Sequence, residues 1–162
     1  MKKGLTEVVF ILDRSGSMSG LEADTIGGAI HHISTVHRYA REEDRPEKTL
    51  FIITTDGMEN ASRRYDYKQV KKLVEKAKKE HGWEFLFLGA NIDAISVAGR
   101  FGIDADYAVN YECDSAGTSL NFEVMCETVS AVRKARSRKE ASMAMKACTA
   151  PIREDYEKRH GK

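Results

Sequence analysis

Residues 8–17 read VVFILDRSGS, an apolar run followed at once by a turn of oxygen-bearing side chains. A second stretch, residues 50–57, has the same organisation and reads LFIITTDG. Apolar runs without alternation are typical of parallel strands that are buried on both faces. Asp13 and Asp56 therefore each follow the end of a predicted strand. Because ligands bind beyond the carboxyl ends of strands in an open α/β sheet, the two stretches predict both a fold and the place of a site.

Two further apolar segments complete a set of four predicted strands, and stripes with helical spacing separate them. The strands are predicted at residues 7–12, 49–54, 83–89 and 107–111. The helical stripes lie within residues 26–40, 70–77 and 92–101, with a cap at Asp66 before the second. This alternation predicts an α/β fold with a doubly wound, Rossmann-like, mainly parallel sheet and helices on both faces.

The side chains of the two turns favour a hard divalent cation. Asp13, Ser15, Ser17 and Asp56 offer only carboxylate and hydroxyl oxygens, which suit Mg²⁺. A polar turn that caps a helix is the alternative for the two serines, since Ser favours such positions for backbone reasons alone. The second carboxylate, at another strand end, favours the metal interpretation, so these four residues are the predicted metal site.

These motifs resemble the metal-ion-dependent adhesion site of von Willebrand factor type A (VWA) domains, which combines an Asp-x-Ser-x-Ser turn with a later Thr-Asp-Gly turn. The resemblance covers most of residues 5–112. It implies that Ser15 and Ser17 bind Mg²⁺ or Mn²⁺ directly, with Asp13 and Asp56 as charged partners. It also implies a protein partner whose acidic side chain completes the metal shell, and hence a protein-binding module that is not an enzyme.

The chain departs from that family between the two motifs. Family members place a β-hairpin and further helices there, and a loop of this insert carries a threonine ligand. Residues 18–55 hold one helical stretch and nothing that reads as a hairpin, so strands 2 and 3 of the family and its threonine ligand are predicted to be absent. A junction near Gly27-Gly28-Ala29 accounts for the shortening.

The shortening also makes a prediction about the sheet. The family strand order is 3-2-1-4-5-6, so the loss of strands 2 and 3 leaves a contiguous sheet of order 1-4-5-6. Residues 8–12 then form an edge strand, although their sequence is that of an interior strand. Because such an edge favours pairing with another chain, we expect a homodimer through the first strand.

Composition sets further expectations. The chain has 162 residues, 41% of them hydrophobic, and a formal charge of +1, which fits one ordinary domain without attraction to nucleic acid or anionic membrane. Its three cysteines, Cys113, Cys126 and Cys148, are widely spaced and odd in number, which indicates reduced thiols in a cytoplasmic protein. The first apolar run is too short for a secretory signal or a membrane span, and no membrane partner is expected.

The last part of the chain differs in charge. Residues 1–136 are predicted to be the VWA-like domain and residues 137–162 a basic helical extension. Residues 114–119 read as a turn or loop before a helix over about 120–135. Ten Lys or Arg and four Asp or Glu lie within residues 133–162, but neither interleaved aromatic residues nor a known motif accompanies them, so nucleic acid is not expected.

Two other functions fit parts of the pattern. A haloacid-dehalogenase-like phosphatase also begins with a strand that ends in Asp and places Thr or Ser after a later strand, as Thr54 and Thr55 are placed. That chemistry requires a second acid two residues after the first, where Ser15 stands, and no histidine is placed to activate a serine. The other alternative is a metal-free scaffold that acts through self-association of its sheet edge.

Overall fold

The sheet has four parallel strands in the order β1-β2-β3-β4. The computed structural model describes residues 1–13, 21–57 and 63–161, and for Asp13 the backbone alone. The strands are β1 (Lys2–Asp13), β2 (Pro46–Thr55), β3 (Glu84–Gly89) and β4 (Ala108–Asn110). The molecule therefore has a Rossmann-like α/β architecture, and its strands follow the spatial order predicted for the shortened sheet.

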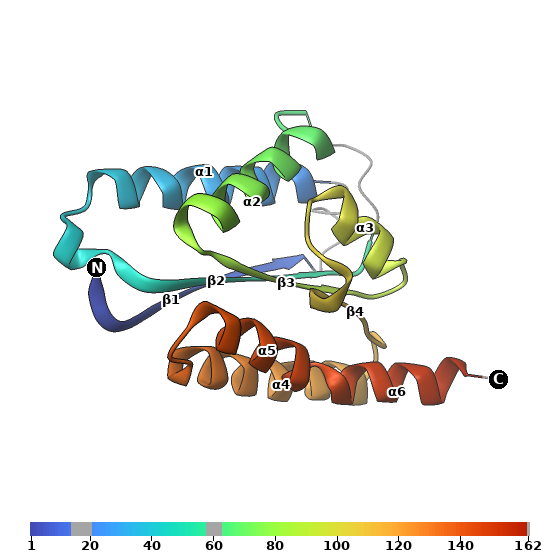
Figure 1. Cartoon of the computed structure of the whole chain (residues 1–162). Helices are drawn as coiled ribbons and strands as arrows, with labels where there is room; N and C mark the ends of the chain where they lie inside the picture. Colours follow the sequence, from blue (N-terminus) through green and yellow to red (C-terminus); the bar gives the residue numbers. More distant parts are fainter. Residues whose placement is uncertain (14–20, 58–62, 162) are drawn as a thin grey trace.

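Helices cover both faces of this sheet (Figure 1). One face carries α1 (Glu22–Tyr39), α2 (Tyr67–His81) and α3 (Ala94–Arg100), and the other carries α4 (Ser115–Lys134), α5 (Arg138–Cys148) and α6 (Ala150–His160). Two short 3₁₀ helices, η1 (Glu42–Asp44) and η2 (Ala105–Tyr107), precede β2 and β4. No helix in the described part of the chain combines the length and apolar character needed to cross a membrane.

Each face of the sheet has its own apolar cluster, because side chains alternate along a strand. Phe51 and Ile53 of β2 pack toward α1 and α2, whereas Leu50 and Ile52 pack toward α4. All seven residues from Thr49 to Thr55 are buried, as expected for a strand with neighbours on both sides and helices on both faces. The two helix layers therefore pack on opposite faces of a sheet whose central strands, β2 from Thr49 onward and all of β3, are buried.

Capping aspartates mark the starts of α2 and α4. Asp66 caps α2 and forms a reciprocal pair of hydrogen bonds with Gln69, which confirms the predicted cap. The prediction of a loop at residues 114–119 is wrong, because α4 already begins at Ser115. Asp114 accepts a hydrogen bond from the backbone N–H of Gly117 at 2.7 Å, so the polar run is a capped first turn rather than a loop.

The last two helices share the core of the sheet. Ala141 and Met145 of α5 and Ile152 of α6 are buried in the cluster that contains Leu86 of β3 and Val109 of β4. The basic side chains of the segment lie around this apolar contact. The segment predicted as a helical extension is therefore helical, and it supplies part of one face of the domain.

Candidate metal centre at the carboxyl edge of the sheet

The carboxyl ends of β1 and β2 lie side by side. Asp13, the last residue of β1, is in register with Thr55, the last residue of β2, and Asp56 follows directly. The backbone thus brings Asp13 and Asp56 to neighbouring strand ends. Ser15 and Ser17, the other two residues of the predicted site, lie outside the described residues.

A third acidic residue, which the sequence analysis missed, lies at the same edge. Glu22 begins α1, and only 5% of its surface is exposed. The hydroxyl of Thr55 donates to Oε1 of Glu22 over 3.3 Å, and the N–H of Gly57 donates to that hydroxyl oxygen over 3.3 Å. Glu22 therefore adds a third carboxyl group at the carboxyl end of β2, one hydrogen bond away from Thr55.

Residues 63–65, which follow Asp56 in the sequence, are hydrogen-bonded to α1. Asp24 accepts hydrogen bonds from the backbone N–H groups of Arg63, Arg64 and Tyr65, at 2.9, 2.7 and 2.6 Å. The bond from Arg63 is the largest of the influences that lower the pKa of Asp24. A carboxyl group whose pKa is lower in the folded than in the unfolded protein stabilises the fold at pH values above its unfolded-state pKa. The stabilisation by Asp24 is therefore present at neutral pH, and it is lost in acid as the pH falls through the lowered pKa.

A glycine in α1 makes room for this connection. A Cβ atom built on Gly27 would lie 2.6 Å from Cγ of the Tyr65 ring, whereas one on Gly28 would meet nothing within 4 Å. The ring of Tyr65 therefore rests directly on the helix backbone at Gly27. This contact, together with the hydrogen bonds to Asp24, holds residues 63–65 against α1.

Three polar residues at the carboxyl ends of β3 and β4 have structural roles: Asn91 and Asp93 follow β3, and Asn110 is the last residue of β4. Asp93 caps α3 by accepting from the N–H of Ser96 at 3.1 Å, and Asn110 accepts from the N–H of Ala94 at 2.9 Å. Asn91 adopts a left-handed backbone conformation, with φ of 58°, as Asn often does in tight turns. None of the three is needed to explain a metal site, so the candidate centre is confined to β1, β2 and the start of α1.

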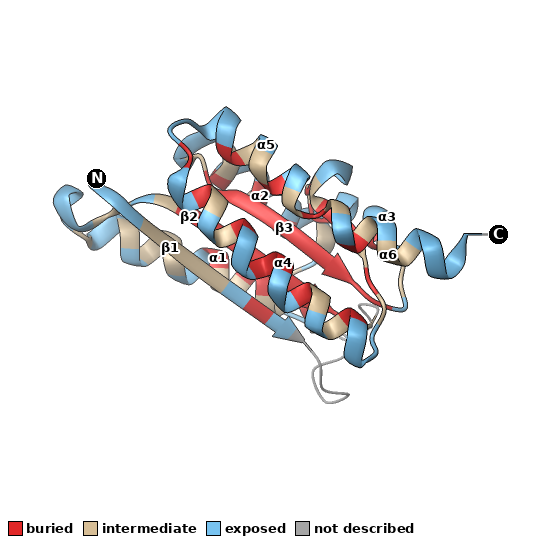
Figure 2. Cartoon of the chain, turned by 90° about the horizontal axis from the view of Figure 1, so that it is seen from below, coloured by how far each residue is buried: buried red, intermediate tan, exposed pale blue. Residues whose placement is uncertain are grey.

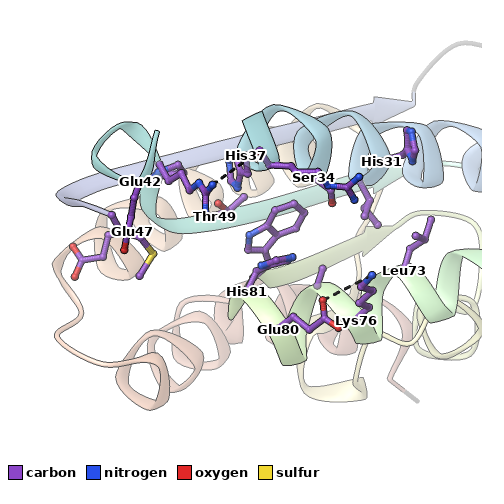
Figure 3. A pocket seen from close by; sticks show the side chains of 17 residues that line it. His31, Ser34, His37, Glu42, Glu47, Thr49, Leu73, Lys76, Glu80 and His81 are labelled. Atoms are coloured by element: carbon purple, nitrogen blue, oxygen red, sulfur yellow. Dashed lines mark hydrogen bonds and ion pairs between the residues drawn. The ribbon is translucent and has the colours of Figure 1, made fainter. Parts of the chain in front are cut away.

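A cavity of about 720 Å³ lies at the opposite, amino end of the sheet, between α1, α2 and the start of β2 (Figure 3). Its lining carries charged groups of both signs, some of which form ion pairs. His37 contacts Glu7 at 3.0 Å, and Lys76 contacts Glu80 at 3.9 Å. The wall includes the aromatic ring of Trp83, against which His37 packs edge-on.

No local sequence pattern indicates this cavity, because its lining comes from three separated segments. Within residues 1–13, 21–57 and 63–161, no three His, Cys, Asp or Glu side chains are arranged to hold a metal ion. This holds for the cavity and for the carboxyl edge alike. The charges of the cavity are of both signs and do not single out a class of ligand. The carboxyl edge is the stronger candidate because Asp13 and Asp56, two of the predicted ligands, lie at its neighbouring strand ends.

The chain was compared with models of protein families, with curated proteins and with solved structures, and none of the three comparisons found a match. Its function is accordingly inferred from its own residues and geometry.

Proposed function

We propose that the carboxyl edge of the sheet binds Mg²⁺ or Mn²⁺ and uses the ion to capture an acidic side chain of a partner protein, as a cytoplasmic VWA-type binding module. One observation carries the proposal: the buried side chain of Glu22 accepts a hydrogen bond from Thr55, the residue that is in register with Asp13 and precedes Asp56. Three separate parts of the chain therefore have an acidic residue at this end of the sheet.

The roles of the residues follow from their chemistry. Asp13, Ser15, Ser17 and Asp56 would supply the oxygen atoms around the ion. Glu22 would orient the ligand Asp56 indirectly: it accepts from the Thr55 hydroxyl, and the oxygen of that hydroxyl accepts from the N–H of Gly57, so that the turn carrying Asp56 is held in place. Groups that orient metal ligands in this way strongly affect metal affinity. Mg²⁺ retains several water molecules when proteins bind it, so a water can take the place of the family's threonine ligand, and an incoming carboxylate can replace another water.

The arrangement favours binding over catalysis. A phosphatase of the haloacid-dehalogenase type would need an acid where Ser15 stands. The Thr55 hydroxyl, a candidate for the later motif of that enzyme class, is already engaged with Glu22 and Gly57. The three cysteines are free thiols, two of them exposed, which supports a reducing compartment such as the cytoplasm.

Thermal unfolding with and without Mn²⁺ tests the proposal. Binding to the folded state alone stabilises it by about 2.7 kcal/mol when the free ion is at roughly one hundred times its Kd, so the melting temperature should rise with Mn²⁺ and fall back with EDTA. Asp56→Asn should remove this rise. Asp44→Asn, in η1 at the amino end of the sheet, makes the same chemical change and should retain it.

Two results would exclude the proposal: no Mn²⁺-dependent rise in the unmodified chain, with calorimetry also silent, or an equal rise in Asp56→Asn. Either would leave the metal-free scaffold as the better account.

A further inference from the structure

We propose that the outer edge of β1 is a dimer interface, at which β1 pairs antiparallel with β1 of a second copy of this chain. The inference rests on the packing of β1 and is independent of metal binding. In the described part of the chain, β1 pairs with β2 alone, in regular register from Thr6 to Asp13. The backbone N–H and C=O groups on the outer side of this stretch need partners, which another strand can supply.

The side chains along this edge are those of an interior strand. Phe10 is 49% exposed and Leu12 is 47% exposed, whereas Ile52, the register partner of Phe10 in β2, is fully buried. Figure 2 shows β1 as an outlying strand of mostly intermediate and exposed residues, in contrast to β3, which is buried along its length. Val9 and Ile11, which alternate with the exposed residues, pack into the cluster beneath α1. The exposed pair therefore lies on the α4 side of the sheet.

A further exposed apolar side chain, that of Phe122, extends this surface onto α4. Phe122 is 49% exposed. Helical spacing puts it about 140° around α4 from Glu127, which is near Cys148 of α5. Because α4 also contacts β1, we infer that Phe122 lies on the β1 side of α4.

The level of Phe122 along the strand follows from Lys48, which is in register with Thr6 and donates to the carbonyl of Val132 at 3.0 Å. Phe122 precedes Val132 by ten residues, or about 15 Å of helix. This distance corresponds to roughly four or five residues of strand, which places it level with Phe10 and Ile11. We call Phe10, Leu12 and Phe122 the edge strip.

A second copy fits the edge strip better than an unrelated strand. In antiparallel pairing, directly opposed residues point to the same face of the sheet, so a two-fold axis perpendicular to the sheet brings each edge strip against its own copy. Pairing centred near Phe10 places Val8 of one chain opposite Leu12 of the other, and every side chain of the α4 face from Val8 to Leu12 is apolar. Two four-stranded sheets would then form one continuous sheet of eight strands.

Sedimentation velocity of the full chain in EDTA, over a range of micromolar concentrations, tests the interface. The unmodified chain should be a dimer. The double variant Phe10→Lys/Leu12→Lys should be a monomer with an unchanged circular dichroism spectrum, because both side chains are half exposed and added charge is tolerated at an edge. Met143→Lys is the matched control: Met143 is 64% exposed on α5, and its replacement should leave the dimer intact.

A second variant keeps the test decisive if the double variant unfolds. Phe10→Cys, combined with Cys113→Ser and Cys126→Ser to remove the exposed native thiols, should form a disulfide-linked dimer on mild oxidation. A monomeric unmodified chain at every concentration would overturn the proposal. So would a dimer that persists in a folded Phe10→Lys/Leu12→Lys variant, or a Phe10→Cys variant that forms no disulfide-linked dimer.

Discussion

Glu22→Gln is expected to weaken Mn²⁺ binding by about 10- to 100-fold, the range typical when a group that orients metal ligands is replaced. The same change should raise the melting temperature of the metal-free protein. The Glu22 side chain is buried beside Thr55, which precedes Asp56, and an amide is less costly to bury than a carboxylate while its oxygen can still accept the hydrogen bond from Thr55. Stability and metal affinity should thus change in opposite directions.

Glu84→Gln is the matched control. Glu84 is also largely buried, and burial raises its pKa, although hydrogen bonding from Ser142 and the charge of Arg138 oppose the rise. It begins β3, at the amino end of the sheet, where Ser142 donates to it at 3.1 Å. Its replacement should leave the Mn²⁺ titration unchanged. Equal metal responses in Glu22→Gln and the unmodified chain would remove Glu22 from the proposed centre.

Gly27→Ala should lower the free energy of unfolding by about 1–3 kcal/mol, the usual cost of inserting a methyl group into a packed contact. The new methyl group would overlap the base of the Tyr65 ring, and that ring cannot withdraw easily because Asp24 holds the backbone N–H of Tyr65 at 2.6 Å. The measurement is equilibrium unfolding in urea.

Gly28→Ala should do the opposite and stabilise the protein by up to about 1 kcal/mol, because alanine is the better helix former and the position opens to free space. The two substitutions differ by one position in the same helix, so helix propensity cancels between them. Equal effects of the two changes would contradict the contact between Tyr65 and α1.

The parallel sheet was predictable because four apolar runs alternate with helical stripes, whereas the strand order was predicted only from the topology that the family resemblance implies. The lengths of the strands were less predictable than their order. β1 extends back to Lys2 because the start of β2 pairs with it, and no apolar pattern marks those residues. β4 covers only three residues, since Tyr107 belongs to η2 and Tyr111 lies beyond the last paired residue.

The site was predictable in part for a similar reason. Asp13 and Asp56 follow apolar runs, so their place at strand ends could be inferred. Glu22 could not be singled out, because an acidic residue in the first turn of a helix is expected on helix-dipole grounds alone. Its burial and its contact with Thr55 arise only when α1 packs against the end of β2. The edge position of residues 8–12, in contrast, follows from strand order and was predicted, whereas the contribution of Phe122 was not.

We propose that a divalent cation binds between the ends of β1 and β2. Paramagnetic broadening of backbone amide resonances by Mn²⁺, measured on ¹⁵N-labelled protein, locates the ion directly. We expect the resonances of residues 22–24 and 54–57 to broaden first, while those of residues 45–49 and 81–84 at the amino end of the sheet persist. Broadening centred instead on His37 and His81 in the amino-end cavity, or none at all, would contradict the claim.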